Sequence, residues 1–593
     1  MRLGLIDFII ISFYLLVSLG IGLYFRRLAT RSVSDFFVSG RNIPWWLAGT
    51  SMVATTFAAD TPLAVTGIVA RNGIAGNWIW WSMAFSGLLT VFFFARFWRR
   101  SRVLTDVEFV AIRYSGPAAR FLRGFRAFYL GLLVNIIVMG WVNLAMVKIF
   151  MLLFGLSKLQ ATFLTLGVML VTAAISTLAG LWGVLVTDFF QFILMMSMVI
   201  ILAVFAVQSV GGMSNLIQEI NLVSRSSGET GSLLSFWPAL HSTWMPLLTF
   251  CVYLFINWWA SWYPGAEPGG GGFIAQRILC ARDERHSLLA TLWFNIAHYA
   301  IRPWPWILVA LVAIVKFRGD AAFAADPESG YIRIMLLTLP DIFRGLMVAG
   351  FLAAYMSTIA TELNWGASYV INDLYRPFIA RNRSERHYVL ASQIATIALM
   401  ILASLVCFFL ESIADAWKFL IALGAGTGLV YLLRWFWWRI NAWSEISAMV
   451  AAFVSSLTYQ RLFGWKESHP LEFAYLVLAT TATTTFVWLM TTLLTRPEPR
   501  EVLLNFYRLI RPEAALWGPI AREAKDVKRD RYILKNFLDW LAGVAMIYAF
   551  LFGLGHLLFS RWFQGILFLI FGFACGFFIY RDLSHRGWET VLE

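Results

Sequence analysis

The sequence predicts an all-α protein that crosses a membrane many times. Hydrophobic residues make up 60% of its 593 residues and charged residues 13%, whereas soluble globular chains are about 25% charged. Apolar runs of about 18 residues or more, the length that a helix needs to span a bilayer, recur along almost the whole chain. We therefore predict a polytopic membrane protein with about fifteen spans.

A hydropathy window of about 19 residues gives the individual spans. They lie at residues 5–25, 43–70, 75–98, 125–154, 159–179, 183–207, 245–263, 288–316, 341–370, 388–411, 415–436, 443–460, 471–495, 536–558 and 563–580. With the N-terminus outside, about 33 of the 47 Lys and Arg residues fall on the cytoplasmic side, as the positive-inside rule requires. The C-terminus is then cytoplasmic. The net charge of +14 needs no nucleic acid, because the basic face would lie on anionic membrane lipid.

Ten spans after the first form two groups of five. An outward polar loop separates the groups. Because five is odd, the second group must cross the membrane in the opposite sense, as an inverted repeat. The predicted parts are an extra N-terminal helix with a basic loop (1–42), the first five-helix repeat (43–207), the external loop (208–244), the inverted second repeat (245–436), peripheral helices (437–495), and a basic cytoplasmic segment with two C-terminal helices (496–593).

Each group of five opens with an interrupted helix. The first contains "TTFAADTP", where an aspartate and a proline meet, and the second contains "WYPGAEPGGGG", with two prolines and five glycines. Non-helical backbone at membrane depth is tolerated where it lines a cavity or is buried in protein. Paired interruptions at matching positions of two halves therefore indicate a transporter binding site near the midplane. For either break alone, a re-entrant loop or the inner end of a helix is the alternative.

The sequence carries no pattern of an enzyme. Cys251, Cys280, Cys407 and Cys575 lie in or beside apolar segments without paired spacing, so they predict neither a disulfide framework nor a zinc site. There is no metal-ligand cluster, nucleophile motif or dinucleotide fingerprint. The stretch "GAGTGLV" at 424–430 has no preceding strand and is typical of helix packing. We predict that the protein is not an enzyme.

Four motifs in order resemble the sodium/solute symporter family, which includes sodium/glucose and sodium/proline cotransporters. They are "SDFFVSGRNIPWW", "GLWGVLVTDFFQ", "GFIAQR", and "GFLAAYMSTIATELN" with "INDLYRP". The resemblance covers roughly residues 1 to 495. It implies the LeuT-like fold of two inverted five-helix repeats, an extra helix in front, an outside N-terminus and substrate in the middle.

The resemblance also implies a sodium site. It falls on the backbone carbonyls of Ala54 and Phe57 at the first break, the carbonyl of Ala354, and the hydroxyls of Ser357 and Thr358. A sodium ion is a hard cation that prefers oxygen ligands, and unwound carbonyls in such a fold supply them. The alternative for the two hydroxyls is a hydrogen bond back to the preceding helical turn.

The solute-contacting positions depart from known members of the family. Trp80 stands near an acidic position of sugar transporters, and Thr61 stands where they carry a glutamine. Thr56 and Ala58 replace an acidic residue and a serine of the proline type. Phe273 matches an aromatic gate of sugar transporters, or it packs in the core. We therefore expect neither galactose nor proline as the solute.

Ionisable residues inside predicted spans are further candidates, because a charge at that depth is costly and usually paired. Asp188 resembles an aspartate that in some members holds or couples a second sodium; otherwise it anchors the inner end of its helix. Glu267 and Arg302 could clamp a zwitterionic or acidic solute, or form structural ion pairs. The others are Asp60 as a solute contact, Glu362, Lys418, and His298 as part of a proton path or as a hydrogen-bonded core histidine.

These features predict a sodium-coupled secondary active symporter of the cell membrane, the inner or cytoplasmic membrane. It would import a small organic solute by alternating access. Sodium, the solute and anionic lipid of the cytoplasmic face are the expected partners, and no protein partner is expected. A solute-sensing transceptor of the same fold and a proton-coupled transporter are the alternatives.

Overall fold

The computed structural model describes residues 4–29, 33–226, 232–260, 267–410, 417, 426–513, 515–527 and 532–586. Within them all regular elements are helical, and one isolated bridge pairs Ile43 with Ala281. Among the described residues, 11 helices are long and apolar enough to cross a membrane, or up to 12 if the bent pair Trp45–Thr56 and Asp60–Asn72 is one span. The predicted all-α, multi-spanning fold is confirmed for the described part of the chain.

The 11 helices and the bent pair match predicted spans. Three predicted spans are not among them. The span at 245–263 contains a shorter apolar helix, Leu247–Ala260, and the span at 443–460 forms helix α24 (Ala442–Phe463). The span at 415–436 lies largely outside the described residues, apart from Trp417 and α23 (Gly428–Phe436). The number fifteen and the sidedness of the termini stay predictions.

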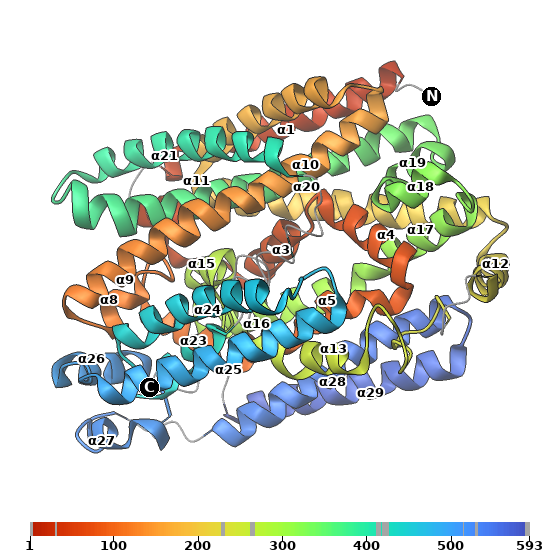
Figure 1. Ribbon diagram of the computed structural model, residues 1–593. Coiled ribbons are helices and arrows are strands. Elements are labelled where there is room, and N and C mark those ends of the chain that lie inside the picture. Colours follow the sequence, from red (N-terminus) through yellow and green to blue (C-terminus); the bar gives the residue numbers. More distant parts are fainter. Residues whose placement is uncertain are drawn as a thin grey trace.

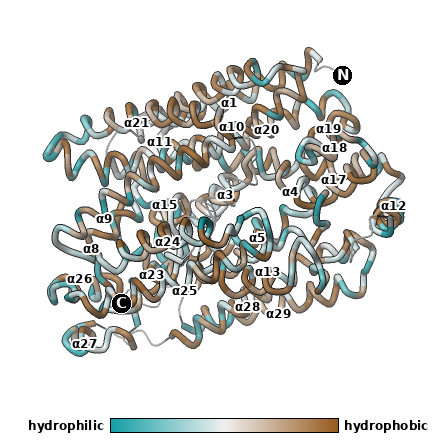
Figure 2. Tube along the Cα trace, viewed as in Figure 1, coloured by the Kyte–Doolittle hydropathy of each residue, from teal (hydrophilic) through white to brown (hydrophobic). Residues whose placement is uncertain are grey.

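The long helices form two outer layers with a central group between them (Figure 1). One layer contains α1 (Leu5–Ala29), α10 (Asn135–Phe154), α11 (Lys158–Ser209), α20 (Asp341–Tyr369) and α21 (Glu385–Val406). The other contains α24, α25 (Pro470–Leu494), α28 (Ile533–Leu558) and α29 (Trp562–Arg586). The helix shafts are mainly hydrophobic, and hydrophilic residues gather towards the ends, for example at α12 (Met213–Ser226) and α27 (Gly518–Ala521) (Figure 2).

The central group supplies most of the candidate residues. Its elements are α3 (Trp45–Thr56), α4 (Asp60–Asn72), η2 (Ile74–Asn77), α5 (Trp78–Trp81), α6 (Ala84–Leu89), η3 (Thr90–Phe94), α7 (Ala95–Ser101), α13 (Leu247–Val252), η5 (Tyr253–Asn257), α14 (Trp258–Ala260), α15 (Gly272–Cys280), α16 (Glu284–Asn295), η6 (Ile296–Ile301) and α17 (Pro303–Lys316). Shorter elements complete the chain: α2 (Val33–Val38), η1 (Ser39–Arg41), α8 (Phe109–Arg113), α9 (Gly116–Phe128), η4 (Tyr129–Val134), α18 (Ala321–Ala325), η7 (Pro327–Ser329), α19 (Gly330–Thr338), η8 (Val370–Ile379), η9 (Cys407–Phe409), α26 (Arg500–Ile510) and η10 (Ala515–Trp517).

The first predicted break is present. Helix α3 ends at Thr56, α4 begins at Asp60, and the two are bent by 57°. Pro62 explains the interruption, because its ring excludes a continuous hydrogen-bonded helix but is tolerated in a first turn, where backbone N–H groups have no intrahelical partner. The chain therefore exposes the carbonyl end of α3 inside the protein.

The second predicted break is also present. In its described part, residues 267–271 are not helical and α15 begins at Gly272; residues 262–266 of the quoted motif lie outside the described part. Gly269 and Gly270 have φ of 86° and 90°, a region that glycine adopts without strain. The glycine run thus permits the turn that leads into α15.

Helix α3 packs closely on α16 through Gly49. A Cβ atom at Gly49 would lie 2.6 Å from the carbonyl oxygen of Ala290, whereas one at Gly167 of α11 would meet nothing within 4 Å. We expect Gly49→Ala to cost about 1–3 kcal/mol of stability through overpacking. Gly167→Ala should be neutral or stabilising by up to about 1 kcal/mol through helix propensity. Thermal unfolding of the two purified variants checks this, and equal melting temperatures would contradict the packing argument.

The C-terminal helices are attached to the central group. Helix α28 contacts α6 and η6, and the Tyr548 hydroxyl donates to the carbonyl of Trp81 at 2.9 Å. The Trp540 indole donates to the carbonyl of Phe85 at 2.9 Å, and the Trp304 indole donates to the carbonyl of Leu551 at 3.0 Å. These indole and hydroxyl donors fix α28 against the helices that follow each break. The division of the chain into six parts stays a prediction.

Candidate functional site

The carbonyl end of α3 meets a pair of hydroxyls on α20. Ser357 and Thr358 are both buried in the middle of α20. The Thr358 hydroxyl is 2.8 Å from the carbonyl oxygen of Thr55 and 3.1 Å from that of Ala354. One side-chain oxygen thus lies within hydrogen-bonding distance of carbonyls on both helices. The family resemblance assigns the carbonyls of Ala54, Phe57 and Ala354 to a site at this point.

Asp188 lies beside this point and is fully buried. Its Oδ1 accepts a hydrogen bond from Ser357 at 2.6 Å, and its Oδ2 accepts one from Ser51 of α3 at 2.5 Å. The guanidinium of Arg277, on α15, lies 3.8 Å from Oδ2. Asp188 therefore connects α11, α3, α20 and the helix after the second break, rather than standing at the inner end of its helix alone.

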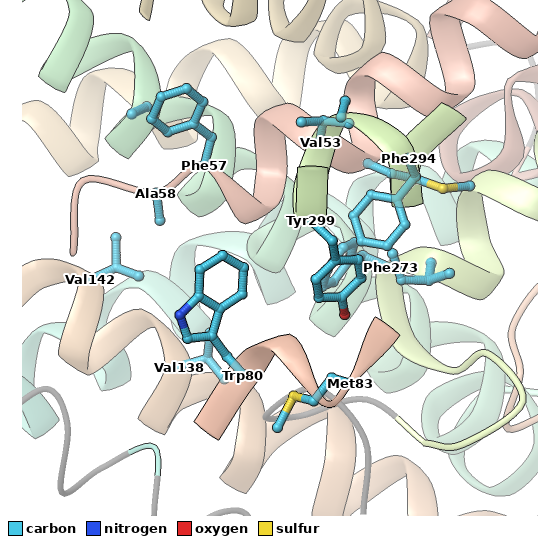
Figure 3. Packing of buried hydrophobic residues seen from close by; sticks show 14 of the residues in the cluster. Val53, Phe57, Ala58, Trp80, Met83, Val138, Val142, Phe273, Phe294 and Tyr299 are labelled. Carbon is cyan, nitrogen blue, oxygen red and sulfur yellow. The ribbon is translucent and has the colours of Figure 1, made fainter. Parts of the chain in front are cut away.

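A cavity of about 160 Å³ lies next to the break, towards the end of α4. Three solute candidates line it: Thr61 of α4, Trp80 of α5, and Arg302 at the start of α17. The rings of Trp80 and Tyr299 are stacked, with centroids 6.0 Å apart. Figure 3 shows Trp80 between Tyr299 on one side and Ala58, Val138 and Val142 on the other. The lining is mainly aromatic and apolar.

Arg302 and His298 close the base of the cavity against α3. Arg302 donates to the Thr56 hydroxyl at 3.0 Å and to the carbonyl of Val53 at 3.3 Å. His298 Nδ1 lies 2.9 Å from the same hydroxyl, and its Nε2 lies 3.2 Å from Arg302. The guanidinium also lies over the ring of Trp306, 5.2 Å from its centroid. A buried cation therefore sits at the negative end of the α3 dipole.

The remaining solute candidates have other surroundings. Asp60 is 2% exposed, and its Oδ1 has no hydrogen-bond partner among the described residues. Phe273 is buried within the core cluster on α15, and Glu362 accepts a hydrogen bond from Asn135 at 2.9 Å. Asp60 and Phe273 are not among the described residues that line the cavity. Lys418 lies outside the described residues.

Glu267, at the second break, belongs to a separate ion cluster away from the cavity. Its carboxylate accepts from Arg126 of α9 and lies 3.4 Å from Arg434 of α23. The same two arginines contact Glu445 of α24, at 2.9 and 3.3 Å, and Tyr114 donates to Glu445 at 2.6 Å. The structure thus does not bring Glu267 and Arg302 together as a clamp. Glu267 instead forms structural ion pairs, the alternative that the sequence left open.

Sequence reasoning missed this cluster. Arg126, Arg434 and Glu445 stand at the edges of predicted spans, where a charge is usually taken to face the lipid headgroups. Each of the three lies within two residues of the edge of a predicted span, and this repeated position is the sequence feature that could have indicated the cluster. The bonded partners in this cluster are up to 331 residues apart in sequence, so the spacing of residues could not predict the pairing.

Comparison with known proteins matches residues 36–452 to the Sodium:solute symporter family. The chain belongs to this family. Relatives of the symporter include the sodium/glucose cotransporter of Vibrio parahaemolyticus, which is 22% identical over 82% of this chain and 91% of its own length. Another is the osmoregulated proline transporter OpuE of Bacillus subtilis, 21% identical over 76% of this chain and 87% of its own length.

A solved structure shares the fold of the symporter. It is the substrate-bound, outward-open state of a Na⁺-coupled sialic acid symporter, with a TM-score of 0.67, 19% identity, and coverage of 84% of this chain and 99% of that chain. This likeness supports the predicted LeuT-like arrangement. The family consists of transporters, so the prediction of a sodium-coupled transporter rather than an enzyme agrees with the family match.

Proposed function

We propose that the symporter carries sodium and a small organic solute together by alternating access around the break between α3 and α4. The proposed sodium ligands are the carbonyls of Ala54, Phe57 and Ala354 and the hydroxyls of Ser357 and Thr358. The contact between Thr358 and the carbonyl of Thr55, at 2.8 Å, carries the proposal, because it joins α20 to the carbonyl end of α3 at the expected place.

The chemistry of this point suits a small cation. The C-terminal end of a half-helix carries partial negative charge. The carbonyl of Ala54 accepts a hydrogen bond from the Phe57 N–H at 3.0 Å, and a carbonyl oxygen has a second lone pair for an ion. A hydroxyl that donates its proton still presents oxygen lone pairs to an ion. Ser357 donates to Asp188 at 2.6 Å, so its lone pairs remain available. Burial of the site strengthens each ion–oxygen contact relative to water.

The cavity is the proposed solute site. It adjoins the break, so solute and ion would share α3 and α4 and bias the same rearrangement of helices. Thr61, Trp80 and Arg302 line it. The stacked Trp80 and Tyr299 rings provide a flat apolar wall, and Arg302 provides positive charge at the base. Asp60 and Phe273 stay proposals as residues around this site.

The proposed orientation places the N-terminus outside and the C-terminus in the cytoplasm of a cell-membrane protein. The basic segment near α26 and α27 would then face anionic lipid. These two helices lie at the opposite end of the molecule from α12 and α18 (Figure 1). The cavity is lined by Arg71 and Asn72 at the end of α4 and by Glu328 of η7, so it faces the end that contains α18.

Uptake into proteoliposomes tests the proposed function. Purified protein is reconstituted, a mixture of small organic solutes is supplied outside, and accumulated solutes are measured by mass spectrometry under an inward sodium gradient. We expect accumulation with sodium and none with an equal potassium gradient. Accumulation driven by a proton gradient alone would favour the proton-coupled alternative, and sodium binding without accumulation would favour a transceptor.

A further inference from the structure

Arg277 lies beside Asp188, the residue to which the family resemblance assigns a second cation. Its side chain is fully buried on α15, after the second break. Its Nε donates to Ser51 at 3.2 Å, its Nη1 to Gln276 Oε1 at 2.7 Å, and its Nη2 to Thr361 at 2.6 Å. The guanidinium therefore binds three buried oxygens, one of which, Ser51 Oγ, also bonds to Asp188, and it lies 3.8 Å from the carboxylate.

The carboxylate of Asp188 is already satisfied by the protein. Ser357 and Ser51 each donate a hydrogen bond to one of its oxygens. The buried negative charge is compensated by the buried positive charge of Arg277, as buried ions require. A further cation here would be beside a guanidinium, and the two positive charges would repel each other strongly in a medium of low dielectric constant.

A sodium ion also needs several oxygen ligands at once. The oxygens of Ser51, Thr361 and Gln276 accept hydrogen bonds from Arg277, and Ser51 also bonds to Asp188. Releasing them would require the guanidinium to leave a fully buried position and lose three hydrogen bonds. By contrast, no described hydrogen bond from Arg277 reaches Ser357, Thr358 or the α3 carbonyls at the proposed sodium site.

We propose that the Arg277 guanidinium is a resident cation at Asp188, so that the symporter binds one sodium ion per chain and not two. This inference rests on the proposed function and defines its ion stoichiometry. For a neutral solute, a membrane potential of about 100 mV would then support roughly fifty-fold accumulation, and two sodium ions would support the square of that factor.

Equilibrium binding of ²²Na⁺ to the purified full chain in lipid nanodiscs tests the proposal. We expect saturable binding of one sodium per chain. Two sodium ions per chain would overturn the inference and leave sodium coupling intact. No saturable binding would instead overturn the proposed function, and this inference with it. The measurement uses the unmodified protein, so it does not depend on the folding of a variant.

Two variants test whether the Arg277 guanidinium takes the place of a cation beside Asp188. Arg277→Gln removes the resident charge, and we expect it to bind two sodium ions per chain because Asp188 becomes available. The matched double variant Arg277→Gln with Asp188→Asn removes both charges and should return to one sodium. A count that stays at one in a folded Arg277→Gln variant would show that the guanidinium does not hold the place of a cation.

Discussion

Replacing Arg126 with methionine is expected to lower the free energy of unfolding by about 3–5 kcal/mol, the cost of breaking a buried ion pair. Arg126 is fully buried and contacts both Glu267 and Glu445. Without it, Arg434 is the one described cation in contact with these two carboxylates, at 3.4 and 3.3 Å. A denaturant titration in mixed micelles, followed by tryptophan fluorescence, measures the loss.

Arg500→Met is the matched control for this prediction. Arg500 also pairs with a glutamate, Glu523, but its side chain is 70% exposed. An exposed pair contributes about 0–1 kcal/mol, so this variant should unfold close to the wild type. Both variants remove an arginine guanidinium that pairs with glutamate, buried at Arg126 and exposed at Arg500.

A second variant separates charge balance from packing. Arg126→Met combined with Glu267→Gln removes one charge of each sign and leaves Arg434 balanced by Glu445. We expect it to recover part of the stability lost in Arg126→Met. Equal losses for Arg126→Met and Arg500→Met, or a double variant less stable than Arg126→Met, would contradict the assignment of Arg126 as the central charge of the cluster.

The helices and breaks could be predicted because their causes are local. An aspartate two residues before a proline within an apolar run, as at Asp60 and Pro62, predicts an interrupted helix, and the structure bends there by 57°. Apolar runs of sufficient length predict membrane helices in the same way, since the reason lies in the segment itself.

The pairing of charges could not be predicted, because it depends on which helices become neighbours. Arg277 was visible in the motif "GFIAQR", but its contacts with Ser51 and Thr361 are 226 and 84 residues away in sequence. The docking of Tyr548 on Trp81 spans 467 residues. Such contacts follow from the packing of whole helices, which no spacing in the sequence contains.

The candidate residues show the same difference between features with a local cause and contacts that depend on helix packing. Ser357 and Thr358 were placed by a motif, and α20 does bring Thr358 to α3. Glu267 was singled out as a charge at membrane depth, which correctly indicated a buried partner but not which one. A buried charge identifies a constraint on the fold, and only the neighbouring helices decide whether that constraint serves structure or solute.

Thr358→Val is expected to raise the sodium concentration for half-saturation by about ten- to hundredfold. Valine keeps the shape of threonine but lacks the oxygen, and a contact with a charged group is worth about 1.5–3 kcal/mol. The double variant Ser357→Ala with Thr358→Ala should weaken sodium binding further while expression stays intact. Binding of ²²Na⁺ at increasing concentrations gives the affinity of each variant.

Two controls distinguish loss of an ion ligand from loss of a structural hydrogen bond. Thr358→Ser keeps the hydroxyl and should retain most of the sodium affinity. If Thr358 acted only through its shape, this variant would lose affinity as Thr358→Ala does. Ser368→Ala removes a buried hydroxyl of the same helix that bonds back to the carbonyl of Trp365 at 2.6 Å. Its sodium affinity should be unchanged. If the double variant kept wild-type affinity, the ion would have to bind elsewhere, because the hydroxyls are the one part of the proposed site that mutation can remove without altering the backbone.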